Sequence, residues 1–158
     1  MKLELRYPAT PENALDHAQL AVEAAWEESE LLLDYSPGSL EGVDAQIEAL
    51  REEGYTSEDV AEALFVLGCY IGEVMRRSWG GRWVATARSP LADLSPWPMV
   101  VALADGSAWD VIGKAYKRLE LGDSEYLPAF FEAAKGGARG ARGATPASRP
   151  PTSRSRSR

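Results

Sequence analysis

The sequence predicts an α+β fold, in which three N-terminal helices pack with a small antiparallel sheet and two short C-terminal helices. Three observations support this class. Apolar residues recur at helical spacing up to residue 79, follow a strand-like period after Gly80-Gly81, and return to helical spacing after residue 111. Helices that flank a run of short strands are typical of α+β domains rather than of alternating α/β folds.

The first helix is predicted to run from Thr10 to about residue 33, because threonine caps helices and Pro11 fits a first turn. The residues before it alternate between apolar and charged types, which indicates either a short edge strand or a flexible arm over 1–10. The face expected to be buried comprises Leu15, Ala18, Val22, Ala25, Trp26, Ser29 and Leu33.

A second helix is predicted from Ser36-Pro37 to Gly54, with an apolar face of Leu40, Val43, Ile47 and Leu50. The third begins after Thr56-Ser57 and is the most apolar, so we expect it at the centre of the fold. Gly68 and Gly72 lie one turn apart on one of its faces. Each glycine costs a helix up to about 1 kcal/mol against alanine, so we expect another segment to pack closely there.

Strands are predicted over 83–88 and 99–103, joined by a proline-rich connection over 89–98. The Asp105-Gly106 pair predicts a tight hairpin turn into a last strand over 108–111. Two short helices over 112–121 and 124–134 complete the domain, with Ser124 as the expected cap of the second.

Length and composition favour one domain, over residues 1–134. The chain has 158 residues and is 45% hydrophobic, which is enough for one core. It lacks an apolar run of about 20 residues and a signal-peptide-like start, so we expect a cytoplasmic protein that does not enter a membrane. The single cysteine excludes an internal disulfide and a cysteine-based metal site.

The net charge of -7 is divided unevenly along the chain. All 24 acidic residues precede residue 135, whereas residues 135–158 carry only basic charges among glycine, serine and proline. Such a low-complexity segment is predicted to be a disordered tail. It could contact nucleic acid, an acidic surface or the chain's own acidic domain weakly, although a solvated extension without a partner is the favoured interpretation.

Three blocks of the sequence stand out: LDYSPGSLEGVD over 33–44, LGCYIGEVMRRSWGGRW over 67–83, and DGSAWDVIGKAYKRLELGDSEYLPAFFEAA over 105–134. In this order they resemble a bacterial domain family of unknown function, and the glycine- and arginine-rich tail resembles those of actinobacterial proteins. The resemblance covers about a third of the chain, with its middle block the most specific. It supports the fold and the grouping of residues, and it implies no reaction.

No complete catalytic or metal-binding constellation appears in the sequence. His17 is the only histidine, and no Gly-x-Ser-x-Gly elbow accompanies it, so we expect a half-exposed helical residue. Glu12, Asp16 and Glu23 have helical spacing but indicate a solvated acidic face rather than a metal site. Neither a phosphate-binding loop nor a dinucleotide-binding turn is present, and no cofactor is predicted.

The candidate site is a basic-aromatic patch on this acidic domain. If the end of the third helix and the later Lys114-Lys117 face converge, they would attract a protein or an anionic ligand, with Gly80-Gly81 permitting close backbone approach. We therefore expect a non-catalytic binding or interaction module. The proposed residues are Arg76, Arg77, Trp79, Arg82, Trp83, Lys114 and Lys117, with Arg118 on the same helical face as the lysines.

Three alternatives stay open at this point. Glu73 could simply pair with Arg76 and Arg77 and close the helix end. It could instead be the general base of an enzyme that acts on an anionic substrate, and its enclosure or exposure would discriminate between these roles. The acidic surface could also bind a basic partner through Glu27, Glu28 and Glu30.

Overall fold

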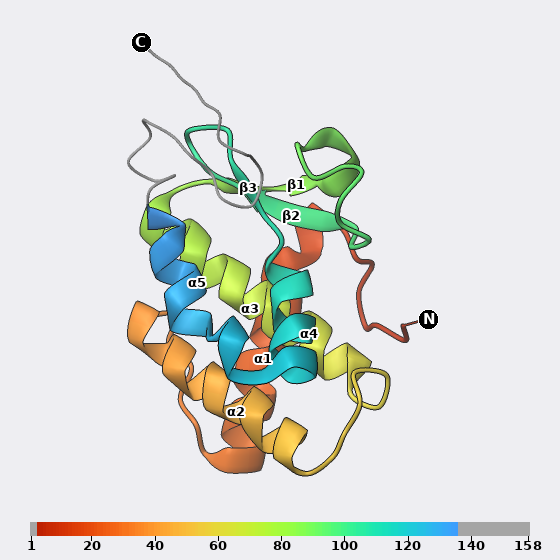
Figure 1. The fold of residues 1–158 in the computed structure, drawn as a ribbon, viewed down its shortest axis with the longest axis vertical. Coiled ribbons are helices and arrows are strands. Elements are labelled where there is room, and N and C mark those ends of the chain that lie inside the picture. The colour runs from red at the N-terminus through yellow and green to blue at the C-terminus, as the bar shows by residue number, and fades with distance from the viewer. Residues whose placement is uncertain (1–2, 136–158) are drawn as a thin grey trace.

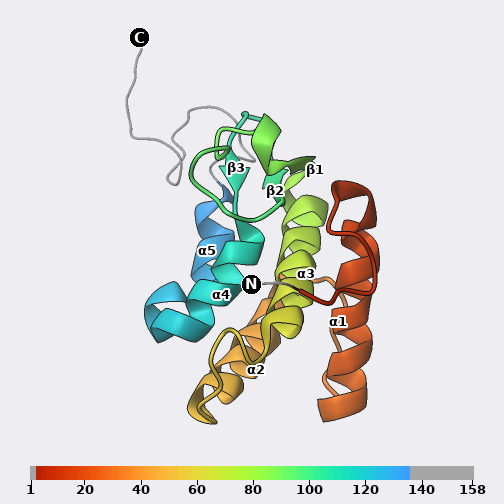
Figure 2. The same cartoon turned by 90° about the vertical axis from the view of Figure 1, so that its right-hand side faces the viewer.

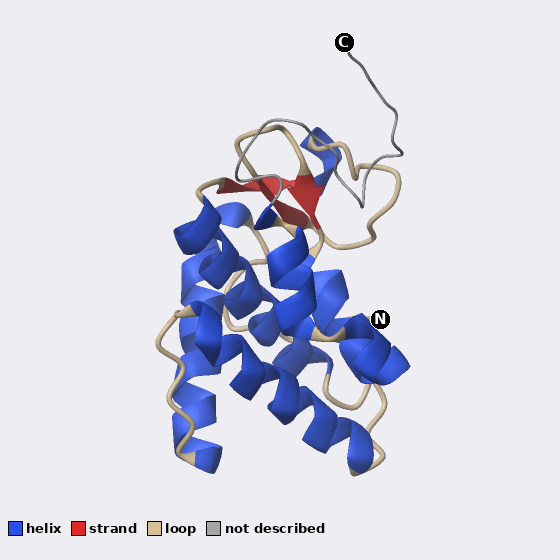
Figure 3. Cartoon of the chain, turned by 60° about the vertical axis from the view of Figure 1, so that its left-hand side comes forward, coloured by secondary structure: helices blue, strands red, loops and turns tan. Residues whose placement is uncertain are grey.

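The computed structural model describes residues 3–135 and confirms the α+β class. Within that range the chain forms five α-helices and a three-stranded antiparallel sheet. Figure 1 shows the sheet at one end of the molecule, above the helices, and Figure 3 shows the same separation with the strands in red. The tail was predicted to be disordered over 135–158, and residues 136–158 of it lie outside the described residues.

Helix α1 spans Ala14–Ser29 and follows a short 3-10 turn at Pro11–Asn13. It ends earlier than predicted because Glu30 adopts a left-handed conformation at φ 54°, and its N–H bonds back to the last turn. Residues 3–10 form no strand.

The predicted buried face of α1 is wrong in part. Leu15 and Trp26 are 46% and 55% exposed, whereas His17, expected to be half-exposed, is fully buried. The physical reason is close packing, since α1 lies against α3 and its buried residues are mainly alanines. A tryptophan would hold the two helices apart, and small side chains let them approach.

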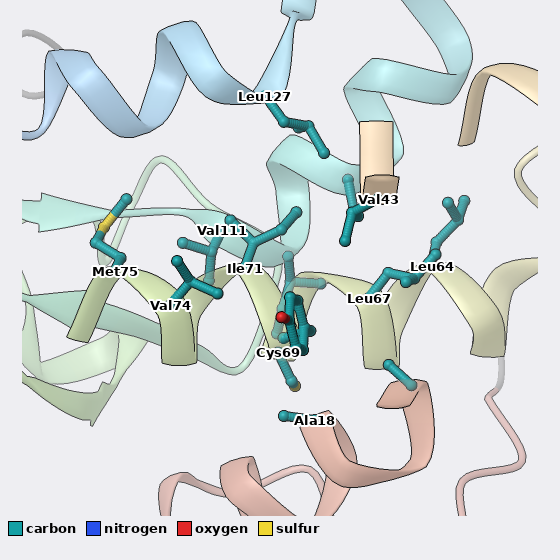
Figure 4. Packing of buried hydrophobic residues seen from close by; sticks show 14 of the residues in the cluster. Ala18, Val43, Leu64, Leu67, Cys69, Ile71, Val74, Met75, Val111 and Leu127 are labelled. Carbon is teal, nitrogen blue, oxygen red and sulfur yellow. The ribbon is translucent and has the colours of Figure 1, made fainter. Parts of the chain in front are cut away.

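Helix α2 (Leu40–Glu52) lies within its predicted range, whereas α3 (Ala61–Trp79) begins later than predicted, because residues 57–60 after Thr56 form a turn. Figure 2 shows α3 between α1 and α4, and α3 packs against both. In Figure 4, Ala18 of α1 lies on one side of α3, and Val43 of α2 and Leu127 lie on the other. The most apolar helix therefore occupies the centre, as predicted.

The close approach predicted at the α3 glycines is confirmed. A β-carbon at Gly68 would lie 2.6 Å from the Cα of Ile112, and one at Gly72 would lie 2.3 Å from the Trp83 ring. Distances this short leave no space for an alanine. These two glycines bring the start of α4 and the indole of β1 directly onto α3.

The sheet contains β1 (Arg82–Ala85), β2 (Met99–Ala102) and β3 (Ala108–Trp109) in that order. The first strand is shorter than predicted because Thr86–Arg88 turns into a 3-10 helix. The predicted tight turn is present, with Gly106 at φ 89° and a Leu103 N–H to Ser107 oxygen bond of 2.9 Å.

Helix α4 spans Val111–Leu121, a 3-10 turn covers Gly122–Glu125, and α5 spans Leu127–Ala133. Asp110 caps α4 by accepting the Gly113 N–H at 2.9 Å. Ser124 does not cap α5, contrary to expectation. Instead the first N–H of α5, from Leu127, donates to Asp44 of α2 at 3.0 Å. None of the described helices has the length and apolar character needed to cross a membrane.

Candidate functional site

The end of α3 holds a buried carboxylate surrounded by donors. Glu73 is 2% exposed. Arg76 donates to both of its oxygens, from Nε at 3.0 Å and from Nη2 at 3.1 Å. Arg77 Nε adds a third bond at 3.2 Å, and the indole nitrogen of Trp83 adds a fourth at 3.0 Å. This local ion pairing is one of the alternatives that the sequence left open.

The surroundings of Glu73 do not suit a general base. Burial alone would raise the pKa of this carboxyl, but the hydrogen bonds from Arg76 and Trp83 outweigh that effect and hold the pKa below its ordinary value. The group is therefore ionised at neutral pH, and four donors occupy its oxygens. A general base must be able to reach and accept a substrate proton, so Glu73 does not suit the role that the enzyme hypothesis gave it.

The arginines of α3 are also committed to neighbouring side chains. The Arg77 guanidinium carbon lies 3.8 Å from the centre of the Tyr35 ring. Tyr35 in turn stacks on Tyr70 with ring centres 4.8 Å apart. Arg76 and Arg77 thus bond to Glu73, and Arg77 also stacks on Tyr35, although 38% and 41% of the two arginine side chains remain exposed.

Trp79 and the double glycine likewise have structural partners. The Trp79 ring stacks on Phe131 at 4.8 Å, and its nitrogen donates to the Phe131 carbonyl at 3.2 Å. Gly80 ends α3 at φ 77°. A β-carbon on Gly81, at φ 132°, would lie 2.5 Å from the Ala102 carbonyl oxygen. Both glycines shape the turn from α3 into β1.

The cations of α4 fall into three different environments. Arg118 is 2% exposed and donates to Asp44 at 2.8 Å and to Glu48 at 2.9 Å, so it is a core residue and not part of a surface patch. Lys114 pairs with Glu125 at 2.7 Å. Lys117 is exposed and has no ion pair within residues 3–135.

Lys114 and Lys117 do meet aromatic side chains, but not the predicted ones. They line a groove between α4, α5 and the 89–98 segment, with a volume of about 490 Å³. We call it the α4–α5 groove. Its walls include Leu94, Trp109, Asp110, Lys114, Lys117, Tyr126 and Phe130.

The aromatic wall of this groove is fixed by internal contacts. Trp109 is 3% exposed, and its indole nitrogen donates to Ser107 Oγ at 2.9 Å. Its ring meets the edge of Phe130 at 5.7 Å. The Lys114 ammonium lies 5.1 Å from the centre of the Phe130 ring. Leu94 and Tyr126 leave 69% and 42% of their surfaces exposed at the groove.

Sequence reasoning missed Asp110, as it missed the aromatic wall of the groove. Burial raises the pKa of its carboxyl, and the Gly113 N–H, the Ser95 side chain and the nearby charge of Lys117 oppose that rise only in part. Gly113 is required here, because a β-carbon would lie 2.3 Å from Asp110 Oδ2. An aspartate between a hairpin strand and a helix is a cap signal, which could have marked this position.

Arg82 lies in a separate hollow. This second space, of about 500 Å³, is lined by Arg82–Ala85 and Arg88 on one side and by Thr10, Pro11 and Glu12 on the other. The seven predicted residues are therefore dispersed. Arg76, Arg77 and Trp83 surround Glu73 and form with it the Glu73 cluster. Lys114 and Lys117 line the α4–α5 groove, Arg82 lines this hollow together with Trp83, and Trp79 packs on Phe131. No hydrogen bond or ion pair within residues 3–135 joins the lysines of α4 to the predicted arginines, and the groove and the hollow share no residue.

The remaining chemistry adds no further candidate. Within the part of the chain that the structure describes, no group of three metal-ligating side chains comes together. No protein-family model, curated protein or solved structure matches the chain. The resemblance of the three sequence blocks to a bacterial family therefore stays a prediction.

Proposed function

We propose that this protein is a non-catalytic binding module whose recognition site is the α4–α5 groove. The observation that carries the proposal is the exposed Lys117, without an ion pair in the described residues, at a cavity walled by Trp109, Tyr126 and Phe130. A largely apolar cavity with a few convergent polar groups is the usual form of a small-molecule site.

The residues that line the groove favour an organic anion with an apolar body as the ligand. The rings and Leu94 would cover the body, and the Lys117 ammonium would attract the anionic group. Lys114 contributes less charge because Glu125 already neutralises it at 2.7 Å. Since Trp109 is held by Ser107 and Phe130, little ordering is needed when a ligand enters.

A matched pair of probes tests this assignment. Isothermal titration with 2-naphthoate should show binding, and titration with 2-naphthalenemethanol, which has the same rings without the charge, should show weaker binding. Lys117→Ala should lower the affinity for naphthoate roughly two- to fivefold, the range of an exposed charge contact. Arg82→Ala removes another exposed cation, from the other hollow, and should leave naphthoate affinity unchanged. Equal affinities for all three proteins would refute the proposal.

The other hypotheses from the sequence keep their status as predictions. Glu27, Glu28 and Glu30 are exposed at the end of α1, where a basic partner could reach them. The tail's contact with nucleic acid concerns residues outside the described range, and a cytoplasmic location also stays a prediction.

A further inference from the structure

Strand β1 has an unpaired edge. The strand order is β1-β2-β3, so β1 pairs with β2 on one side only within the described residues. The Thr86 N–H donates to the Pro98 oxygen at 3.0 Å and continues the same register. Hydrogen-bonded positions alternate along an antiparallel pair, so Val84 and Arg82 face β2. The N–H and C=O groups of Trp83 and Ala85 must therefore point away from the sheet.

The hollow that contains Arg82 runs along this edge. All four residues of β1 line it, although consecutive side chains of a strand point to opposite faces. Val84 indeed packs against the cluster of Leu91 and Val100, whereas Trp83 covers Gly72 of α3. A hollow that touches both sets lies beside the strand rather than over one face. Figure 2 shows the red N-terminal segment, with Pro11–Asn13, next to β1.

The walls of this hollow carry an excess of positive charge. Arg82 and Arg88 are exposed, and neither has an ion pair within residues 3–135. Glu12 on the opposite wall is ionised at neutral pH, because hydrogen bonds from its own backbone and from Thr10 lower its pKa. One carboxylate thus faces two guanidinium groups.

We propose that the unpaired edge of β1 accepts an extended acidic peptide as a fourth strand. The backbone of the peptide would exchange hydrogen bonds with Trp83 and Ala85, in the manner of strand addition to a sheet edge. Its carboxylates would meet Arg82 at one end of the strand and Arg88 beyond the other. This site is independent of the α4–α5 groove, and neither proposal depends on the other.

Ala85→Pro separates strand addition from simple charge attraction. Ala85 has φ -64°, which is the angle that proline imposes, and it follows an extended strand residue. The substitution removes a single N–H that points away from the sheet and leaves both arginines in place. It should therefore fold with an unchanged or higher melting temperature while losing the outward donor.

The probe is acetyl-Glu-Val-Glu-Val-Glu-amide, titrated into the full chain at low salt. We expect measurable binding to the wild type, at least about a tenfold loss with Ala85→Pro, and a smaller loss with Arg88→Ala. The same peptide N-methylated at all five residues, which keeps no backbone N–H within its residues, should bind to the wild type as weakly as the unmethylated peptide binds to Ala85→Pro. Lys117→Ala should bind the peptide as the wild type does.

Three results would overturn the proposal. The first is no binding of the peptide to the wild type, and the second is undiminished binding to a folded Ala85→Pro variant. The third is a wild-type dimer in sedimentation that Ala85→Pro converts to a monomer, because a second copy would then be the occupant of the edge. The second result is decisive when Ala85→Pro melts at the same temperature as the wild type, because misfolding of the variant is then excluded.

Discussion

The indole nitrogen of Trp83 donates to Oε2 of Glu73 at 3.0 Å, and this bond joins β1 to the end of α3. It explains why residues 68–83 hold cations, indoles and glycines in so short a span. Gly72 makes room for the Trp83 ring, and the ring brings its N–H to a carboxylate that Arg76 also holds. The cations and the indole of this segment thus provide the hydrogen bonds that the buried Glu73 carboxylate needs where α3 meets the sheet.

Glu73→Gln should destabilise the protein by about 2 kcal/mol at neutral pH, the scale of hydrogen bonds to a charged group. The reason is that the amide places a donor against the guanidinium and indole donors. Because the pKa of Glu73 is lowered in the folded state, its stabilisation is present above its ordinary value of 4.5 and is lost as the pH falls further. Urea denaturation should therefore show that the difference in free energy of unfolding between wild type and variant is smaller at pH 3 than at pH 7.

Glu132→Gln is the matched control for this effect. Its carboxylate is 62% exposed and lies 3.7 Å from Lys135, so its loss should change the free energy of unfolding by less than about 1 kcal/mol. A gap between wild type and Glu73→Gln that stays constant from pH 7 to pH 3 would contradict the assignment of Glu73 as an ionised hub.

Gly68→Ala should destabilise the fold although alanine favours helices. The added methyl would meet the backbone of Ile112 at 2.6 Å, and forcing apart α3 and α4 costs about 1–3 kcal/mol. In Gly42→Ala the methyl meets only the end of the Leu31 side chain at 3.0 Å, so the gain in helix propensity should prevail. Thermal melting of both variants tests the difference, and a Gly68→Ala variant as stable as Gly42→Ala would disprove it.

Arg118→Met should cost about 3–5 kcal/mol, because it leaves the buried carboxylate of Asp44 without its partner. Lys117→Met changes the preceding, exposed position and should shift stability by no more than about 0.5 kcal/mol. Chemical denaturation compares the two variants. If they unfold at the same denaturant concentration, Arg118 does not have the core role that its contacts indicate.

The sequence predicted what depends on neighbours along the chain. The pairing of Glu73 with Arg76 and Arg77 follows from helical spacing, and Gly68 and Gly72 indicated close packing because a helix gains nothing else from them. The prediction of the buried face of α1 was wrong because it assumed that the largest apolar side chains, such as Trp26, would be the buried ones. Proximity to α3 selects alanines there instead.

Contacts between distant segments could not be predicted in the same way. Arg118 and Asp44 are 74 positions apart, so the chain gave no sign that one cation of α4 turns inward while Lys117 stays outside. The groove also depends on contacts between distant segments, since Trp109 precedes α4 and Phe130 lies on α5, and the two rings meet only in the folded chain. The predicted patch contained the right kinds of residue, but only its two lysines belong to this groove.

The most direct test of the α4–α5 groove is residue-resolved mapping of an apolar anion on the protein. In amide NMR spectra of the full chain titrated with 2-naphthoate, we predict that the largest saturable shifts come from Trp109, Lys117 and Phe130. The indole signal of Trp109 should move with them, and the amides of Trp83 and Ala85 should stay still. Shifts centred on β1 or on the Glu73 cluster, with the groove signals unchanged, would contradict the account.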